Sequence, residues 1–181
     1  MMSTAAPLKN PQPVAPNVTA ISPEEYLAIS AFIYRDARLA DESRYAEWEA
    51  LVDDDMIYWV PRGEGDFDMN KHLSITADNR SRLRTRIAQL NTGERHSQLP
   101  VSRMRRVVSN IEVERKGDGE YQVFSNFVLY ELRMSSTRTV EVWPGRTEHH
   151  LRWKNNELKM YFKKVTLVHG DEAIPSLAFI I

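Results

Sequence analysis

Three side chains that could act as acid–base groups, Asp36, Tyr58 and His96, are spread over the first half of the chain. Asp36 falls near the apolar stripe of a predicted amphipathic helix, so its carboxylate could face the interior of the domain. A carboxylate, a phenol and an imidazole that converge in one pocket could serve an isomerase or a dehydratase. The simpler interpretation, which we favour, is that Asp36 and Arg35 form surface or buried ion pairs.

The histidines offer a second possible chemistry, metal binding. His96, His149 and His150 could be combined with Asp36 or Asp78 as the carboxylate ligand. Their spacing fits no standard ligand arrangement, and two adjacent residues of a strand point to opposite faces. We therefore interpret them as structural or surface histidines, and we assign no catalytic, cofactor-binding or metal-binding residue to this chain.

Positive charge is concentrated in one third of the chain. The arginines concerned are Arg80, Arg82, Arg84, Arg86, Arg95, Arg103, Arg105 and Arg106. Single-stranded nucleic acid would require aromatic residues between them, and this stretch has none. Paired charges and contacts with a protein partner explain them better. The acidic triplet Asp53–Asp55 is expected to end a helix, where negative charge is unfavourable, so we predict that it pairs with these arginines.

Composition narrows the class of protein further. The chain has 181 residues, 42% of them hydrophobic, which is enough for one domain with a real core. Its net charge of -1 argues against binding to nucleic-acid backbones. The absence of cysteine excludes disulfides, thiolate nucleophiles and cysteine-ligated iron–sulfur clusters in this chain. No apolar run is long enough to span a bilayer and no signal segment opens the chain, so we predict a cytoplasmic protein without membrane contact.

Helical signals dominate the first half. Residues 1–20 contain several prolines and are predicted to form an extended arm before a single domain at residues 21–181. Ser22 and Glu25 form a capping-box pattern at the start of a helix. Asp41 is predicted to cap a second helix, and a third is predicted at residues 79–91. The apolar stripes of these helices are Tyr26, Ile29, Ile33, Ala37 and Ala40, then Tyr45, Trp48, Leu51 and Val52, then Leu83, Ile87 and Leu90.

Strand signals dominate the second half. Residues 104–168 show the period of two expected of four long antiparallel strands, and Trp143-Pro144-Gly145 is predicted to form a bulge or bend. Short strands are predicted at residues 56–60, 73–77 (with Leu73, Ile75 and Ala77 on one face) and 174–181. Helices followed by such strands indicate an α+β domain, in which a long curved antiparallel sheet holds about three helices on its concave face.

The predicted sheet has more apolar surface than three helices can cover. Residues 121–133 are apolar on both faces, which implies cover on two sides. The aromatic residues Trp143, Trp153, Tyr161 and Phe162 add to this surface. Such an excess is typical of a protein–protein interface, although an internal pocket lined by the same residues would also explain it.

Several motifs resemble the small (β) subunits of aromatic-ring-hydroxylating dioxygenases. Residues 32–39 (FIYRDARL), 41–48 (DESRYAEW) and 54–61 (DDMIYWVP) are similar to the opening of that family. Residues 100–113 (PVSRMRRVVSNIEV) are similar to its strand signature. Gly145-Arg146, Leu151-Arg152 and the terminal residues 175–179 fit the same pattern, and residues 94–99 depart from its commoner form.

The resemblance implies an NTF2-like or cystatin-like cone that works as a subunit. In that family, three small and three large (α) subunits form an α3β3 hexamer. The large subunit carries a Rieske [2Fe–2S] cluster and a mononuclear Fe(II), and it adds O₂ to an aromatic ring with electrons from NADH that arrive through a reductase. The small subunit is mostly structural. On this basis we expect a large-subunit partner, self-association as a trimer and no cofactor in this chain.

The residues expected to contact the partner are Arg103, Arg105, Arg106 and Trp143. Two alternatives to the subunit hypothesis stay open at this point. One is a free-standing NTF2-like isomerase or dehydratase that uses Asp36, Tyr58 and His96, and the other is a binding protein for a small hydrophobic ligand. The sequence does not indicate which aromatic compound would be oxidised.

Overall fold

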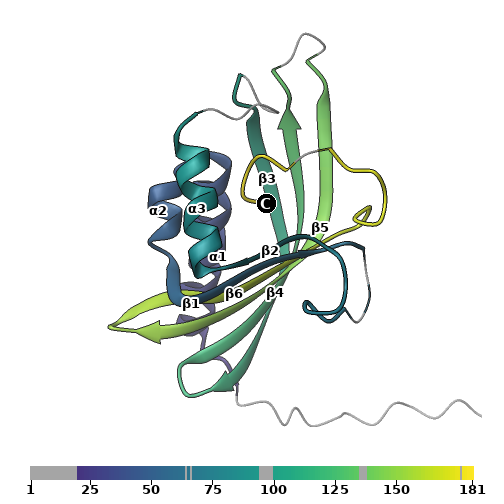
Figure 1. Ribbon diagram of the computed structural model, residues 1–181. Coiled ribbons are helices and arrows are strands. Elements are labelled where there is room, and N and C mark those ends of the chain that lie inside the picture. The colour runs from purple at the N-terminus through teal and green to yellow at the C-terminus, as the bar shows by residue number, and fades with distance from the viewer. Residues whose placement is uncertain (1–19, 64, 66, 94–99, 135–137, 176) are drawn as a thin grey trace, which may run out of the picture.

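A six-stranded curved sheet and three helices make up the described part of the chain (Figure 1). The computed structural model describes residues 20–63, 65, 67–93, 100–134, 138–175 and 177–181, so all but the last residue of the predicted arm lies outside it. The strand order is β2-β1-β6-β5-β4-β3. The elements are α1 (Pro23–Asp41), α2 (Tyr45–Glu49), β1 (Val52–Pro61), β2 (Ser74–Asn79), α3 (Arg80–Asn91), β3 (Arg103–Gly117), β4 (Glu120–Leu132), β5 (Val140–Lys154) and β6 (Glu157–Leu167).

Helix α1 begins as predicted and ends differently. Ser22 and Glu25 form the capping box, in which each side chain accepts a hydrogen bond from the other residue's backbone N–H. The helix continues through Asp41, so the prediction that Asp41 caps the next helix is wrong. The Asp41 carboxylate instead pairs with Arg106 of β3. None of the described helices is both long enough and apolar enough to cross a membrane.

Helix α3 and strand β2 meet at Asn79. The Asn79 side chain accepts a hydrogen bond from the Arg82 N–H and so caps α3, which buries Leu83, Ile87 and Leu90 as predicted. The strand predicted at residues 73–77 is β2, in which Thr76 and Asp78 are buried, while Leu73 lies just before the strand and is exposed. Asp78 can lie inside because Arg86 donates a 2.6 Å hydrogen bond to its carboxylate.

The four long strands β3 to β6 pair as consecutive antiparallel neighbours, which confirms the predicted meander. A bulge or bend was predicted at Trp143-Pro144-Gly145; the bulge is wrong, because β4 and β5 pair in unbroken register through these residues. The Pro144 carbonyl accepts a hydrogen bond from the Val168 N–H, just after the end of β6. The nitrogen of Pro144, which has no hydrogen to donate, faces the same side of the strand. A β-bulge lies instead in β3, where Asn110 adopts a positive φ of 53°.

The acidic triplet Asp53–Asp55 belongs to strand β1 and does not end a helix as predicted. Asp53 is buried and accepts hydrogen bonds from Arg152 Nε at 2.6 Å and Lys154 Nζ at 2.5 Å, both on β5. Its partners are therefore strand residues far along the chain, and not the arginines that we predicted.

The C-terminal residues lie in the core without forming a strand, which corrects the strand predicted at residues 174–181. Phe179, Ile180 and Ile181 are buried. The Tyr58 hydroxyl accepts from the Ile181 N–H at 3.1 Å and lies 3.3 Å from the Ile181 carbonyl oxygen. The tail thus crosses the hollow between the helices and the long strands, where Figure 1 marks the C-terminus.

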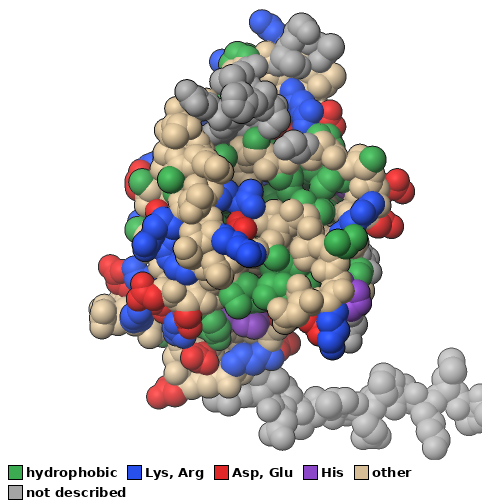
Figure 2. Space-filling view, in the orientation of Figure 1, with side chains coloured by type: hydrophobic (Ala, Val, Ile, Leu, Met, Phe, Trp, Pro, Cys, Tyr) green, Lys and Arg blue, Asp and Glu red, His purple; other side chains and the backbone are tan. Residues whose placement is uncertain are grey.

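The two faces of the sheet differ in cover. On β4, the face toward the helices and the tail carries buried side chains, while the opposite face alternates between half-buried and exposed ones. Hydrophobic side chains are visible between the helices and β5, and basic side chains gather over the helices, in the space-filling view (Figure 2). Three helices and the tail therefore cover one face only, as the excess of apolar residues predicts.

Candidate partner interface

The centre of the cone holds a buried polar cluster around Asp36. Trp48 Nε1 donates to Asp36 Oδ1 at 2.6 Å, and Lys163 Nζ donates to Asp36 Oδ2 at 2.9 Å. His149 Nε2 lies 3.3 Å from the same Oδ2. Of the other two residues in the possible acid–base trio, Tyr58 is bonded to the C-terminal tail, and His96 lies outside the described residues.

Burial and charge act in opposite directions on this cluster. Burial would raise the pKa of Asp36, but the Lys163 ammonium and the hydrogen bond from His149 hold the pKa of that carboxyl far below its usual range. Burial lowers the pKa of His149, so its imidazole is neutral at pH 7. The cluster is therefore an Asp36–Lys163 ion pair with a neutral histidine beside it.

This cluster is closed to solvent. The side chains of Asp36, His149 and Lys163 expose 4%, 1% and 0% of their surface. A substrate could not reach the carboxylate without displacing packed residues. Of the surface or buried ion pair expected for Asp36, the structure shows the buried one, with Lys163. Lys163 was missed because a lysine followed by Lys164 on a strand looks like a solvent-facing residue. Only the pairing of β6 with β5 shows that the Lys163 side chain faces the interior.

The histidines predicted to be structural are placed as follows. His149 and His150 point to opposite faces of β5, and the outward His150 ring packs on Phe162 with 4.6 Å between centroids. Among the described residues, no three His, Cys, Asp or Glu side chains are grouped so that they could hold a metal ion. The donor set of the described chain thus does not suit an iron or iron–sulfur site.

Two of the four residues predicted to contact a partner are buried within the chain. Arg106 pairs with Asp41 through Nε and Oδ1 at 2.7 Å and donates through Nη2 to the Ile180 carbonyl at 3.0 Å. Trp143 is 1% exposed and donates from Nε1 to Glu131 at 3.1 Å. Both side chains are committed to the protein's own interior, so the prediction that they contact a partner does not fit this structure.

The other two predicted residues, Arg103 and Arg105, lie on the opposite face of β3. Cross-strand pairing places them in two rows over three strands. The rows are Arg103–Leu132–Val140 and Arg105–Tyr130–Val142, followed by a third row, Val107–Val128–Pro144. We call these nine residues the outer patch.

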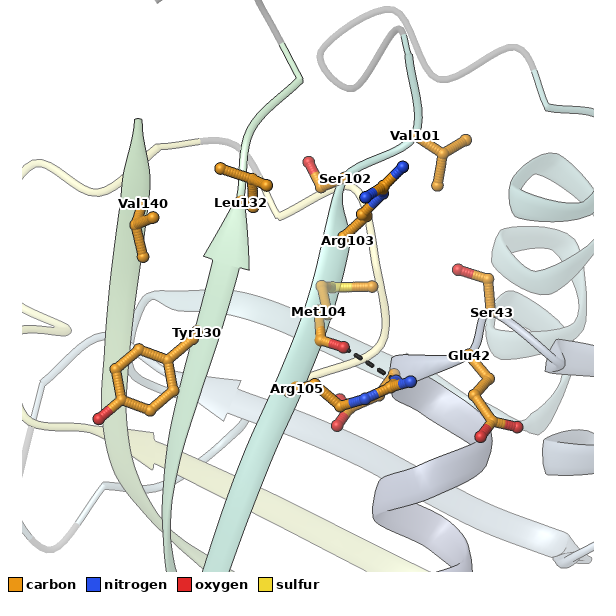
Figure 3. A pocket seen from close by; sticks show the side chains of 11 residues that line it. Glu42, Ser43, Val101, Ser102, Arg103, Met104, Arg105, Tyr130, Leu132 and Val140 are labelled. Atoms are coloured by element: carbon orange, nitrogen blue, oxygen red, sulfur yellow. Dashed lines mark hydrogen bonds between the residues drawn. The ribbon is translucent and has the colours of Figure 1, made fainter. Parts of the chain in front are cut away.

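The outer patch exposes large apolar side chains. Val107 is 63% exposed, Val140 56%, Tyr130 47% and Val142 46%. A groove of about 690 Å³ opens at the same end of the sheet, between the patch and the turn after α1 (Figure 3). Its walls include Tyr130, Leu132 and Val140 on one side and Glu42, Ser43 and Val101 on the other, with Arg103 and Arg105 between them (Figure 3). Clustered apolar exposure of this kind marks an interaction surface.

Comparison with known proteins identifies the family of this chain. The family model described as "Ring hydroxylating beta subunit" matches residues 35–171. The small oxygenase component of the p-cumate 2,3-dioxygenase system of Pseudomonas putida is 31% identical over 141 residues, which are 77% of this chain and 77% of that protein. The match therefore covers most of both proteins.

Solved structures support the predicted α+β NTF2-like fold. A chain of naphthalene 1,2-dioxygenase with indole bound in its active site superposes with a TM-score of 0.73 at 17% identity, covering 90% of this chain and 89% of that one. A scytalone dehydratase-like protein of Novosphingobium aromaticivorans superposes with a TM-score of 0.61 at 16% identity, covering 84% and 91%. These identities establish the fold alone.

Because the family model spans most of the chain and the p-cumate relative does as well, this protein belongs to the ring-hydroxylating beta subunits, the small subunits of aromatic-ring-hydroxylating dioxygenases.

Proposed function

We propose that this chain is a non-catalytic, structural small subunit of a cytoplasmic terminal oxygenase. Residues 21–181 form its single domain, and three copies assemble with three large subunits as an α3β3 hexamer. The large subunit holds the Rieske [2Fe–2S] cluster and the mononuclear Fe(II), and it adds O₂ to an aromatic ring with electrons passed from NADH by a reductase. The chain lacks cysteine, and its described residues offer no iron-binding group, so both iron centres are assigned to the partner.

The observation that carries this proposal is the contrast between a filled interior and an uncovered outer face. The cone interior is occupied by the Asp36–Lys163 ion pair and by the C-terminal residues 179–181, all buried. The outer patch, in comparison, exposes valines and a tyrosine to solvent. A protein arranged in this way is suited to binding another subunit on its surface, and poorly suited to binding a substrate inside.

Co-expression with the large subunit from the same gene cluster tests the proposal. We expect the chain alone to purify without stoichiometric iron and without turnover, and the pair to co-purify as a hexamer that contains iron. Native mass spectrometry and elemental analysis measure both results. About one tightly bound iron per chain in the isolated small subunit, or no binding to the large subunit, would contradict the proposal.

The second candidate is a dehydratase-like or isomerase-like enzyme, which the likeness to the scytalone dehydratase-like fold favours. Asp36 and His149 already lie 3.3 Å apart inside the cone, as an acid–base pair would. Turnover per intact hexamer of the Asp36→Asn variant distinguishes the two candidates. We expect little change once assembly is normalised; a loss of about 10²-fold in fully assembled protein would favour catalysis by this chain.

A further inference from the structure

The outer patch combines apolar side chains with two arginines that have no carboxylate partner in the described part of the chain. Among the described residues, neither Arg103 nor Arg105 forms an ion pair; Arg105 Nη1 donates only to the neighbouring Met104 carbonyl, at 3.1 Å (Figure 3). Arg106, the residue after Arg105, faces the other side of the strand and is bonded to Asp41 and to the Ile180 carbonyl. The Cα atoms of Arg103 and Arg105, two residues apart on one face of the strand, lie roughly 7 Å from each other.

The backbone edge of β3 is closed to a further strand at this point. Asp41 Oδ2 accepts a hydrogen bond from the Arg106 N–H at 2.7 Å, and the Arg105 guanidinium donates one to the Met104 carbonyl. A partner segment therefore cannot extend the sheet here by pairing with these groups. The side chains of the outer patch, and the groove next to them, are what remains available for contact.

Carboxylates that already pair within their own chain are poorly suited to fill this role in a second copy. Many of the described surface carboxylates already have a cation in their own chain. Such pairs are Glu25–Arg115, Glu47–Arg44, Asp68–Lys71, Glu112–Arg146, Glu114–Lys116 and Glu157–Lys159. A contact with another copy that used these carboxylates would have to break such pairs to neutralise Arg103 and Arg105. A different protein with free acidic groups would not.

We infer that the outer patch is the docking site for a segment of the large subunit that carries two carboxylates beside apolar side chains. The carboxylates pair with Arg103 and Arg105, for which guanidinium geometry favours two-oxygen contacts. The apolar side chains cover Tyr130, Val140 and Val142 and enter the groove beside Leu132. This inference rests on the proposed function, since it names the surface through which that assembly forms.

The test measures the affinity of the purified small subunit for the large subunit. Two variants remove the two parts of the site: Arg103→Glu combined with Arg105→Glu, and Tyr130→Ser. The matched controls are Arg82→Glu combined with Arg84→Glu on α3, which changes the net charge equally, and Leu73→Ser, at a side chain that is 77% exposed. Circular dichroism and urea midpoints verify that every variant folds.

We expect each site variant to bind the large subunit at least about tenfold more weakly, as truncation of a central interface residue does, and the controls to bind as the unmodified chain does. The double arginine variant should also lose most of the salt dependence of association.

Unmodified chain that fails to bind the large subunit would overturn the proposed function and this inference together. Unmodified chain that binds, with site variants that bind equally well, would overturn the docking site and leave the function standing. Variants that lose only self-association would show that the occupant is a second copy, which also overturns it.

Discussion

The two faces of the curved sheet use charged residues in opposite ways. On the inner face, Lys163 and Asp36 are buried together, and the ion pair is completed by hydrogen bonds from Trp48 and His149. On the outer face, Arg103 and Arg105 border exposed apolar residues and have no carboxylate partner among the described residues. The inner charges are satisfied within the chain, while the outer ones are available to another molecule.

The difference teaches how to separate residues that hold this fold together from residues that meet a partner. Arg105 and Arg106 are adjacent in sequence and both looked like interface residues. Because successive side chains of a strand alternate, Arg106 turns inward to Asp41 and Ile180, and Arg105 turns outward. Burial with a complete set of partners indicates a structural role, and exposure without one indicates a binding role.

The largest expected effect comes from breaking the inner ion pair. Lys163→Met leaves the Asp36 carboxylate buried without its cation, so we expect the free energy of unfolding to fall by about 3–5 kcal/mol. Urea denaturation measures it. Lys164→Met, at the neighbouring half-buried residue that points outward, is the control and should cost less than about 1 kcal/mol. The double variant Asp36→Asn with Lys163→Met should recover part of the loss; if Lys163→Met alone costs less than its control, the inner pair is not structural.

A smaller effect should separate the two adjacent arginines. Arg106→Leu removes the partner of buried Asp41, so we expect a loss of stability of about 2–4 kcal/mol. Arg105→Leu should change stability by less than about 0.5 kcal/mol, because its side chain makes no described ion pair. Thermal or urea unfolding of both variants provides the comparison. Equal destabilisation by the two substitutions would show that the faces do not differ as described.

The smallest effect concerns pH and His149. Burial lowers the pKa of His149 in the folded chain, so below about pH 6.5 the unfolded chain binds a proton that the folded chain does not. The stability contributed by this neutral imidazole is present above that pH and decreases as the pH falls toward 5, with a slope of at most about 1.4 kcal/mol per pH unit. His149→Gln should flatten the slope between pH 7 and 5. An unchanged slope would mean that His149 does not titrate on unfolding.

Asp36 titrates in a separate and lower window. Its folded pKa is depressed, so its contribution is fully present above about pH 4, the ordinary value in the unfolded chain, and is lost only as the pH falls below that. Urea midpoints collected at pH 7, 5 and 3 separate the histidine window from the carboxylate window.

Much of the fold follows from local sequence alone. The capping box at Ser22 and Glu25, the stripe of Leu83, Ile87 and Leu90 and the four alternating strands are all as predicted, because each depends on neighbours a few residues away. The absence of cysteine and the motifs at residues 32–61 and 100–113 likewise indicate the family without any structure.

Tertiary structure decided which side chains the charges meet. Asp41 looked like a helix cap, but α1 runs through it and its carboxylate reaches Arg106, 65 residues later in the chain. Lys163 looked like a surface residue, but the register of β6 with β5 turns it toward Asp36, 127 residues earlier. The outer patch exists only because three strands align Arg103 with Leu132 and Val140, and Arg105 with Tyr130 and Val142. Local periodicity assigns a residue to one of two faces, but the pairing of distant strands determines which face is inside and what lies opposite each charge.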